Sequence, residues 1–299
     1  MRASHDLHMN ARIRSLRWVQ PGAAVLLLAG AMALSGCMSS EDRASMAAGD
    51  SILAPVFKQF TPADAAAWAA DPYDADKRAR GMAMLANAPF GGAEAYVKLY
   101  RERVTPNAKG EYDASPVVAT AARALGMHGN ADDVAKIVPL ARFEEPMVRL
   151  DAVRSLQRLH NRAAIPVLIE RLDMDKESEP EIRAEAASAL GQYAEERVLT
   201  SLSMSLADPS LLVNKNAHES LRTLTGNDET PADRKLWADW VKQHETPFAG
   251  RRDYVFPVFW REKRWLDYVP FMPAVPNETA STPVGFSREQ GTPVAVKKP

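Results

Sequence analysis

The only cysteine of the 299-residue chain, Cys37, is the residue with the widest range of chemistry. A cysteine can act as a nucleophile, bind a metal ion, fill a core or carry a lipid. One cysteine cannot form an internal disulfide or a cysteine-based zinc site. Its surroundings, ALSGCMSS, contain no general base, second thiol or metal ligand. The residues next to Cys37 therefore offer it no catalytic or metal-binding partner, which leaves burial in a core or attachment of a lipid.

Other side chains of catalytic or metal-binding type are dispersed along the chain. Beyond residue 36 the sequence has no HExxH motif and no paired-histidine spacing, so we expect no transition-metal site. The histidines in this part are His128, His160, His218 and His244. The acidic run DMDKESEPE, which starts at Asp173, lacks the glycine and the ligand spacing of a calcium-binding loop. We expect it to be a solvated turn.

Motifs for nucleotide and acyl chemistry are missing as well. The sequence contains no Gly-rich phosphate loop, GxSxG elbow or dinucleotide fingerprint. The 37 basic and 38 acidic residues leave a net charge of -1, which provides no field to hold a nucleic acid. The sequence therefore predicts no catalytic residue, no cofactor, no metal ion and no nucleic-acid partner.

The first part of the chain has the layout of an export signal. Arg12, Arg14 and Arg17 form a positive region before the apolar stretch 23–34, which is too short to span a bilayer comfortably. Small and polar residues follow the cysteine over residues 38–49. We therefore expect this part of the chain to contribute nothing to the folded core.

The residues around the cysteine resemble the bacterial lipobox. The matching tetrad is Leu34, Ser35, Gly36 and Cys37. The resemblance implies that residues 1–36 are a lipoprotein signal peptide, that Cys37 is acylated, and that residues 37–60 tether the protein to the lipid bilayer. Met38, in place of the aspartate that retains some lipoproteins in the inner membrane, favours a periplasm-facing place on the outer membrane. An ordinary signal peptide and an uncleaved anchor are the alternatives.

A repeat of 31 to 34 residues occupies the middle of the chain. Its copies share a β-branched residue, a small residue four positions on and a leucine eight positions on, which places all three on one helical face. The copies are VVATAARALGMH from Val117, VRLDAVRSLQRL from Val148, IRAEAASALGQY from Ile182 and VNKNAHESLRTL from Val213, with a weaker one from Lys77. The aligned leucines are Leu125, Leu156, Leu190 and Leu221. A second helical stretch follows each copy, and the even spacing favours a solenoid over an irregular helical bundle.

These copies resemble HEAT repeats and the bacterial HEAT-like repeats. The resemblance is strong over residues 116–226 and weaker over residues 64–105. It implies an all-α fold, an α-solenoid in which HEAT-like helical hairpins form an α-α superhelix over residues 61–226, in about four or five repeats.

The resemblance also implies ion pairs between an acid in each turn and the arginine near the start of the next helix. The matching positions are Glu144 or Glu145 with Arg149, and Asp173 with Arg183. Val118 and Asn214 occupy the arginine column in two other repeats, so we expect the series of pairs to be incomplete.

The sequence changes character after the last repeat. Residues 227–246 predict a closing helix with Thr230 as its N-cap. Residues 247–276 form an extension rich in aromatic residues and proline, and residues 277–299 are predicted to be a disordered tail.

The aromatic extension has three interpretations. Its rings either lie back over the final repeats, dock a protein partner, or contact the membrane interface, although interleaved acids count against the last. The residues that would bind a partner are Tyr254, Phe259, Trp260, Arg261, Arg264, Trp265 and Tyr268.

The sequence as a whole predicts a membrane-anchored, non-enzymatic lipoprotein that binds proteins of the cell envelope. Stacked repeats create extended surfaces that proteins commonly use for binding. The alternatives are an enzyme or enzyme subunit of the HEAT-like lyase kind, which rests on analogy of fold alone, and an architectural protein that touches cell wall or membrane.

Overall fold

The computed structural model describes residues 61–256 and 281–286, so Cys37, the lipobox and the tether lie outside the described residues. The secondary structure of the described part is helical. Among these described helices, none has both the length and the apolar character that a membrane crossing requires. The α-helices are α4 (Pro62–Ala69), α5 (Ala75–Ala86), α6 (Glu94–Arg103), α7 (Ser115–His128), α8 (Val134–Ile137), α9 (Pro146–Arg158), α10 (Ile165–Leu172), α11 (Pro180–Leu190), α12 (Glu196–Ser205), α13 (Leu211–Thr225) and α14 (Arg234–Gln243). Short 3-10 helices also occur. Two of them flank α8, namely η2 (Ala131–Asp133) and η3 (Val138–Arg142), and η4 (Arg162–Ala164) precedes α10.

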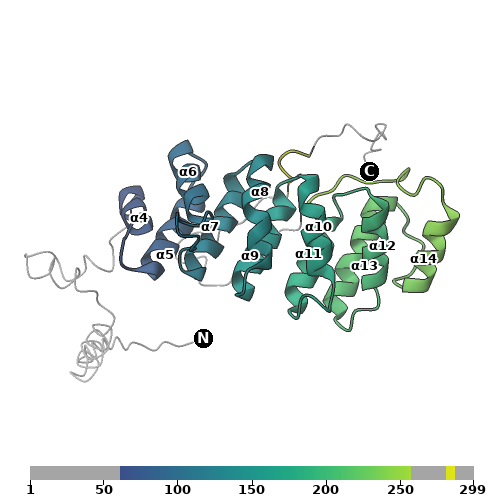
Figure 1. Ribbon diagram of the computed structural model, residues 1–299. Helices are drawn as coiled ribbons and strands as arrows, with labels where there is room; N and C mark the ends of the chain where they lie inside the picture. The colour runs from purple at the N-terminus through teal and green to yellow at the C-terminus, as the bar shows by residue number, and fades with distance from the viewer. Residues whose placement is uncertain (1–60, 257–280, 287–299) are drawn as a thin grey trace, which may run out of the picture. The chain divides into compact units, whose positions relative to one another are not determined.

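The helices form two rows that follow the order of the chain (Figure 1). In the first row α5, α7, α9, α11 and α13 each pack against the next, and the second row contains α6, α8 with η3, α10, α12 and α14. The four aligned leucines, Leu125, Leu156, Leu190 and Leu221, are fully buried between the rows. The predicted α-solenoid is therefore confirmed.

Two glycines let neighbouring helices of the first row approach closely. Gly126 of α7 lies against Ser155 of α9, and Gly191, directly after α11, lies against Ser220 of α13. The two serine hydroxyls donate hydrogen bonds of 2.8 Å back to carbonyl oxygens of α7 and α11. Repeats with an Ala-Leu-Gly triplet thus alternate with repeats that have a Ser-Leu pair, and the two kinds form matched contacts between successive helices.

We expect the substitution Gly126→Ala to destabilise the solenoid by about 1–3 kcal/mol, the usual cost of overpacking a core. The new Cβ would lie 2.7 Å from Ser155 Oγ and 2.8 Å from Ser155 Cα. Urea unfolding followed by circular dichroism measures the change. The double variant Gly126→Ala/Ser155→Gly should recover part of the loss, and strictly additive effects would contradict the contact.

The closing helix α14 begins later than the sequence suggested. Asp233, not Thr230, is its N-cap, and the Asp233 carboxylate accepts a hydrogen bond of 2.9 Å from the Leu236 backbone N–H. Thr230 lies in the preceding loop, where its hydroxyl accepts a hydrogen bond from Asn227. The Asp233 carboxylate therefore fixes the start of the helix, and α14 places Trp237 in the core with no exposed surface.

After α14 the chain turns back along the solenoid. We call residues 250–256 and 281–286 the return segment. Arg251 donates a hydrogen bond to the Gln192 carbonyl oxygen, and the Tyr254 hydroxyl donates one to the Ser188 carbonyl oxygen. Val284 exchanges backbone hydrogen bonds with the chain at the end of α9, forming an isolated parallel bridge. The return segment thus covers the ends of α9 and α11. Residues 281–286 were predicted as part of a disordered tail, and that prediction is wrong for them because their backbone pairs with the chain after α9.

Candidate functional site

Arg149 of α9 defines how one repeat is joined to the next. Its Nη1 donates hydrogen bonds to the carbonyl oxygens of Phe143 and Glu144, in the turn before α9, at 3.0 and 2.6 Å. Its Nε and Nη2 donate to the Glu177 carboxylate, in the turn before α11, at 2.7 and 2.8 Å. One guanidinium therefore binds the carbonyls of its own turn and the acid of the next.

Arg183 of α11 repeats this arrangement one unit later. It donates to the carbonyl oxygens of Glu177 and Ser178, and to the Asp208 carboxylate before α13 at 2.8 and 3.1 Å. The acid in the preceding turn, Asp173, instead accepts from a backbone N–H of its own loop. The predicted pair of Arg183 with Asp173 is therefore wrong, as is that of Arg149 with the Glu144 or Glu145 side chain. The extended arginine side chain reaches the next repeat, whereas its own turn offers it carbonyl oxygens.

Arg78 of α5 follows the same rule at the start of the solenoid. It donates to the Asp71 carbonyl oxygen in its own turn and to the Asp113 carboxylate before α7 at 2.6 and 3.1 Å. Arg103 also pairs with Asp113 at 3.0 Å. Three repeats thus hold a guanidinium at the same place between consecutive turns.

The carboxylates of Glu177 and Asp113 are ionised at neutral pH. Burial by itself would raise the pKa of Glu177, but the hydrogen bonds from Arg149 and the nearby positive charges outweigh it and hold the pKa below its ordinary value of 4.5. The same balance of burial against hydrogen bonding from Arg78 lowers the pKa of Asp113. The buried carboxylates therefore stay ionised and keep their arginine partners.

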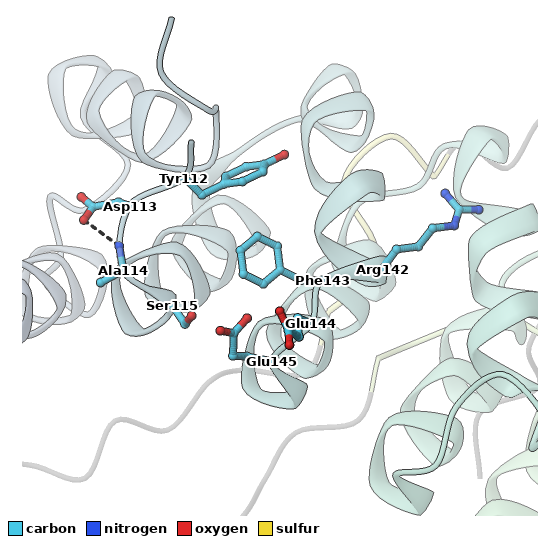
Figure 2. A pocket seen from close by; sticks show the side chains of 8 residues that line it. All are labelled: Tyr112, Asp113, Ala114, Ser115, Arg142, Phe143, Glu144 and Glu145. Carbon is cyan, nitrogen blue, oxygen red and sulfur yellow. Dashed lines mark hydrogen bonds between the residues drawn. The ribbon is translucent and has the colours of Figure 1, made fainter. Parts of the chain in front are cut away.

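The series is interrupted in α7, where Val118 occupies the arginine column. Val118 is fully buried and has no group that could donate to the turns on either side. A surface pocket of about 560 Å³ lies between those two turns. Figure 2 shows the residues that line it: Tyr112, Asp113, Ala114, Ser115, Arg142, Phe143, Glu144 and Glu145.

The pocket contains two carboxylates without a cationic partner. In residues 61–256 and 281–286 no ion pair involves Glu144 or Glu145. The Oε2 atom of Glu145 is buried and has no hydrogen-bond partner among the described residues. The Arg142 guanidinium points away from the two glutamates, as Figure 2 shows, and pairs with Glu170 at 2.6 Å. The pocket therefore carries uncompensated negative charge.

Two aromatic rings form the wall beside these carboxylates. Tyr112 and Phe143 meet edge to face, with ring centroids 5.2 Å apart and an angle of 81° between the ring planes. Asp113 lies on the same side, but its charge is balanced by the two arginines already described. A ring pair beside free carboxylates is suited to a flat or extended organic cation.

The histidines lie in separate repeats. Each is hydrogen-bonded within the chain: His128 to the Ala86 carbonyl oxygen and His160 to Gln192, both in another repeat, and His218 to the Thr230 carbonyl oxygen and His244 to the Trp240 carbonyl oxygen. Within the part of the chain that the structure describes, no three His, Cys, Asp or Glu residues are grouped closely enough to hold a metal ion.

The residues expected to bind a partner are placed only in part. Tyr254 belongs to the return segment, is 5% exposed and packs against the end of α11, so it offers no surface to another protein in this structure. The others, Phe259, Trp260, Arg261, Arg264, Trp265 and Tyr268, lie outside the described residues. The pocket beside Val118 was not predicted as a site, although a valine in the arginine column is visible in the sequence.

Comparison with known proteins supports the repeat assignment. A family model described as HEAT repeats matches residues 112–179, the part that includes both the pocket and the Arg149 pair. No protein with a curated description matches the chain significantly. Nineteen chains of solved structures match. One is an engineered protein from the Northeast Structural Genomics Consortium, with a TM-score of 0.41 and 18% identity over 55% of this chain and 78% of that chain.

The HEAT-repeat match and the stacked hairpins indicate a helical-repeat scaffold with a role in protein interactions. Stacked repeats of this fold commonly present extended surfaces to other proteins.

Proposed function

We propose that the chain is a lipid-anchored, non-enzymatic scaffold that binds a protein partner in the cell envelope. The observation that carries the proposal is the unbroken stack of helical hairpins from α5 to α14, which presents consecutive turns along one edge. Stacked repeats of this kind provide extended surfaces for other proteins. The paired arginines and acids fix the spacing of those turns, so the surface is held in one arrangement before a partner binds.

The anchor in this proposal is Cys37, within the tetrad from Leu34 to Cys37. Acyl chains contribute about 0.8 kcal/mol for each buried methylene group, and two or more chains hold a protein stably on a bilayer. Residues 37–60 would act as a tether that allows the solenoid to meet partners at some distance from the membrane surface. Met38 favours the outer membrane, with the solenoid facing the periplasm.

The substitution Cys37→Ser tests the anchor. We expect the variant to incorporate no labelled palmitate, because serine offers no thiol for acylation. We also expect the processed, membrane-bound form of the protein to disappear from the membrane fraction. Fractionation and metabolic labelling measure both effects, and Ser40→Ala is the matched control. A Cys37→Ser protein that remains in the membrane and keeps its function would disprove the anchoring.

Binding of a partner is tested by co-purification from detergent-solubilised envelopes. The bait is the full chain, and the control is residues 1–60 fused to an unrelated soluble domain. We expect at least one protein to be enriched by the full chain and not by the control, since the proposed binding surface lies in the solenoid. Equal recovery with both baits, or no recovery with either, would contradict the proposal.

A further inference from the structure

We propose that the pocket beside Val118 binds an arginine side chain presented by the protein partner. This inference rests on the proposed function and adds the place and chemistry of recognition. The starting point is the series of guanidinium sites between consecutive turns, which α5, α9 and α11 fill with their own arginines and α7 does not.

The pocket has the parts of the filled sites. Arg149 and Arg183 each donate to the carbonyl oxygens of the residues six and five positions before them. Counted from Val118, these positions are Tyr112 and Asp113, and both line the pocket. The two residues whose carbonyl oxygens correspond to the acceptors of the filled sites therefore line the pocket, as the repeat pattern requires.

The carboxylates that an arginine site needs are also present. Glu177 and Asp208 accept the guanidinium from the turn of the following repeat. The turn that follows α7 supplies Glu144 and Glu145 to the pocket. The Glu145 carboxylate lines the pocket, and its Oε2 has no hydrogen-bond partner among the described residues, so no donor of the chain competes with a guanidinium that pairs with this carboxylate. Leaving such a group unpaired is costly, so its pairing favours complex formation.

An arginine fits this site better than a lysine or a metal ion does. The guanidinium is planar and presents five N–H donors in a fixed fork, which can bind a carboxylate and carbonyl oxygens at once. It also stacks on aromatic rings, which Tyr112 and Phe143 supply at the wall. The local arginines cannot take its place, because Arg78 and Arg103 hold Asp113, and Arg142 holds Glu170.

The first test uses a minimal probe on the full chain in detergent. N-acetyl-arginine-N-methylamide is titrated while saturation-transfer NMR reports its contact with the protein, and the citrulline analogue gives the same shape without the charge. We expect the arginine probe to bind about tenfold more tightly than the citrulline probe, since charge-assisted hydrogen bonds are much the stronger. Equal binding of the two probes would overturn the proposal.

Variants locate the binding. Val118→Arg places a guanidinium in the pocket from within the chain and should abolish probe binding while the protein stays folded. Glu145→Gln should weaken the probe about tenfold by removing the unpartnered carboxylate. The control is Glu181→Gln, which removes one negative charge from an exposed position at the start of α11. This variant should bind the probe as tightly as the parent chain does. Retention of binding by Val118→Arg would place the probe elsewhere and overturn the inference, and Glu145→Gln gives a second answer if Val118→Arg does not fold.

The same variants separate this inference from the proposed function. A partner that co-purifies with the parent chain but not with Val118→Arg supports both. A partner recovered equally well with Val118→Arg overturns the arginine site and leaves the scaffold proposal standing. A probe that binds the pocket selectively while no partner is recovered supports the site and contradicts the scaffold.

Discussion

Replacing Glu177 by alanine is expected to lower the free energy of unfolding by about 3–5 kcal/mol, the usual cost of breaking a buried ion pair from one side. The Glu177 side chain has no exposed surface and pairs with both Arg149 and Arg171. Its removal leaves two largely buried guanidinium groups without their carboxylate, and it also removes an acceptor for the Glu179 backbone N–H. Urea unfolding followed by circular dichroism gives the change directly.

The matched control for this prediction is Glu181→Ala, four residues along the chain. The Glu181 side chain is 57% exposed and pairs with Arg154 at the surface, where ion pairs contribute about 0–1 kcal/mol. A Glu177→Ala variant no less stable than the Glu181→Ala variant would show that the arginine series does not hold the repeats together.

Removing the Trp237 side chain is the second change with a large expected effect. Trp237→Ala should cost about 3–5 kcal/mol, the range found for deleting a large buried aromatic group. Trp237 is fully buried and packs edge to face against His218 of α13 and Trp240 of α14. A solenoid needs a closing element over its last hydrophobic face, and this ring supplies the contact between α14 and the final repeat.

Two controls separate the packing of Trp237 from its polar group. The indole N–H has no partner among the described residues, so Trp237→Phe should cost much less than Trp237→Ala. Leu236→Ala, at a side chain that is about half exposed, should have a small effect. If Trp237→Phe proved as damaging as Trp237→Ala, the account of α14 as an apolar cap would be wrong.

The repeat architecture could be predicted because its signal is local and repeated. A buried leucine in the first helix of each repeat, with a small residue four positions before it, marks the same face in every copy. Leu125, Leu156 and Leu190 therefore identified the core without any knowledge of the contacts between repeats.

The pairing of arginines with acids could not be derived in the same way. Arg183 has acids on both sides in the sequence, with Asp173 in the turn before its helix and Asp208 in the turn before the next repeat, so the sequence alone does not choose between them. Only the geometry of the stack shows that the side chain extends toward the following repeat. The position of the pocket depends on that direction, because the unpaired acids that line it belong to the turn after α7. The valine was visible in the sequence, but its consequence was not.

The path of the C-terminal extension was also beyond the sequence. Tyr254 was assigned both to packing over the repeats and to partner binding, since a tyrosine serves either role. Its burial and its hydrogen bond to the Ser188 carbonyl oxygen depend on the chain turning back after α14. No local pattern encodes such a return.

Site-specific photo-crosslinking in living cells tests the central claim most directly. A photoreactive amino acid is placed at Ala114, which lines the pocket, and at Met204, an exposed position on α12 in the second row, as the control. The account predicts one defined protein adduct from Ala114, mapped by mass spectrometry to a segment that contains an arginine, and none from Met204. No adduct at Ala114, or the same adducts from both positions, would contradict it.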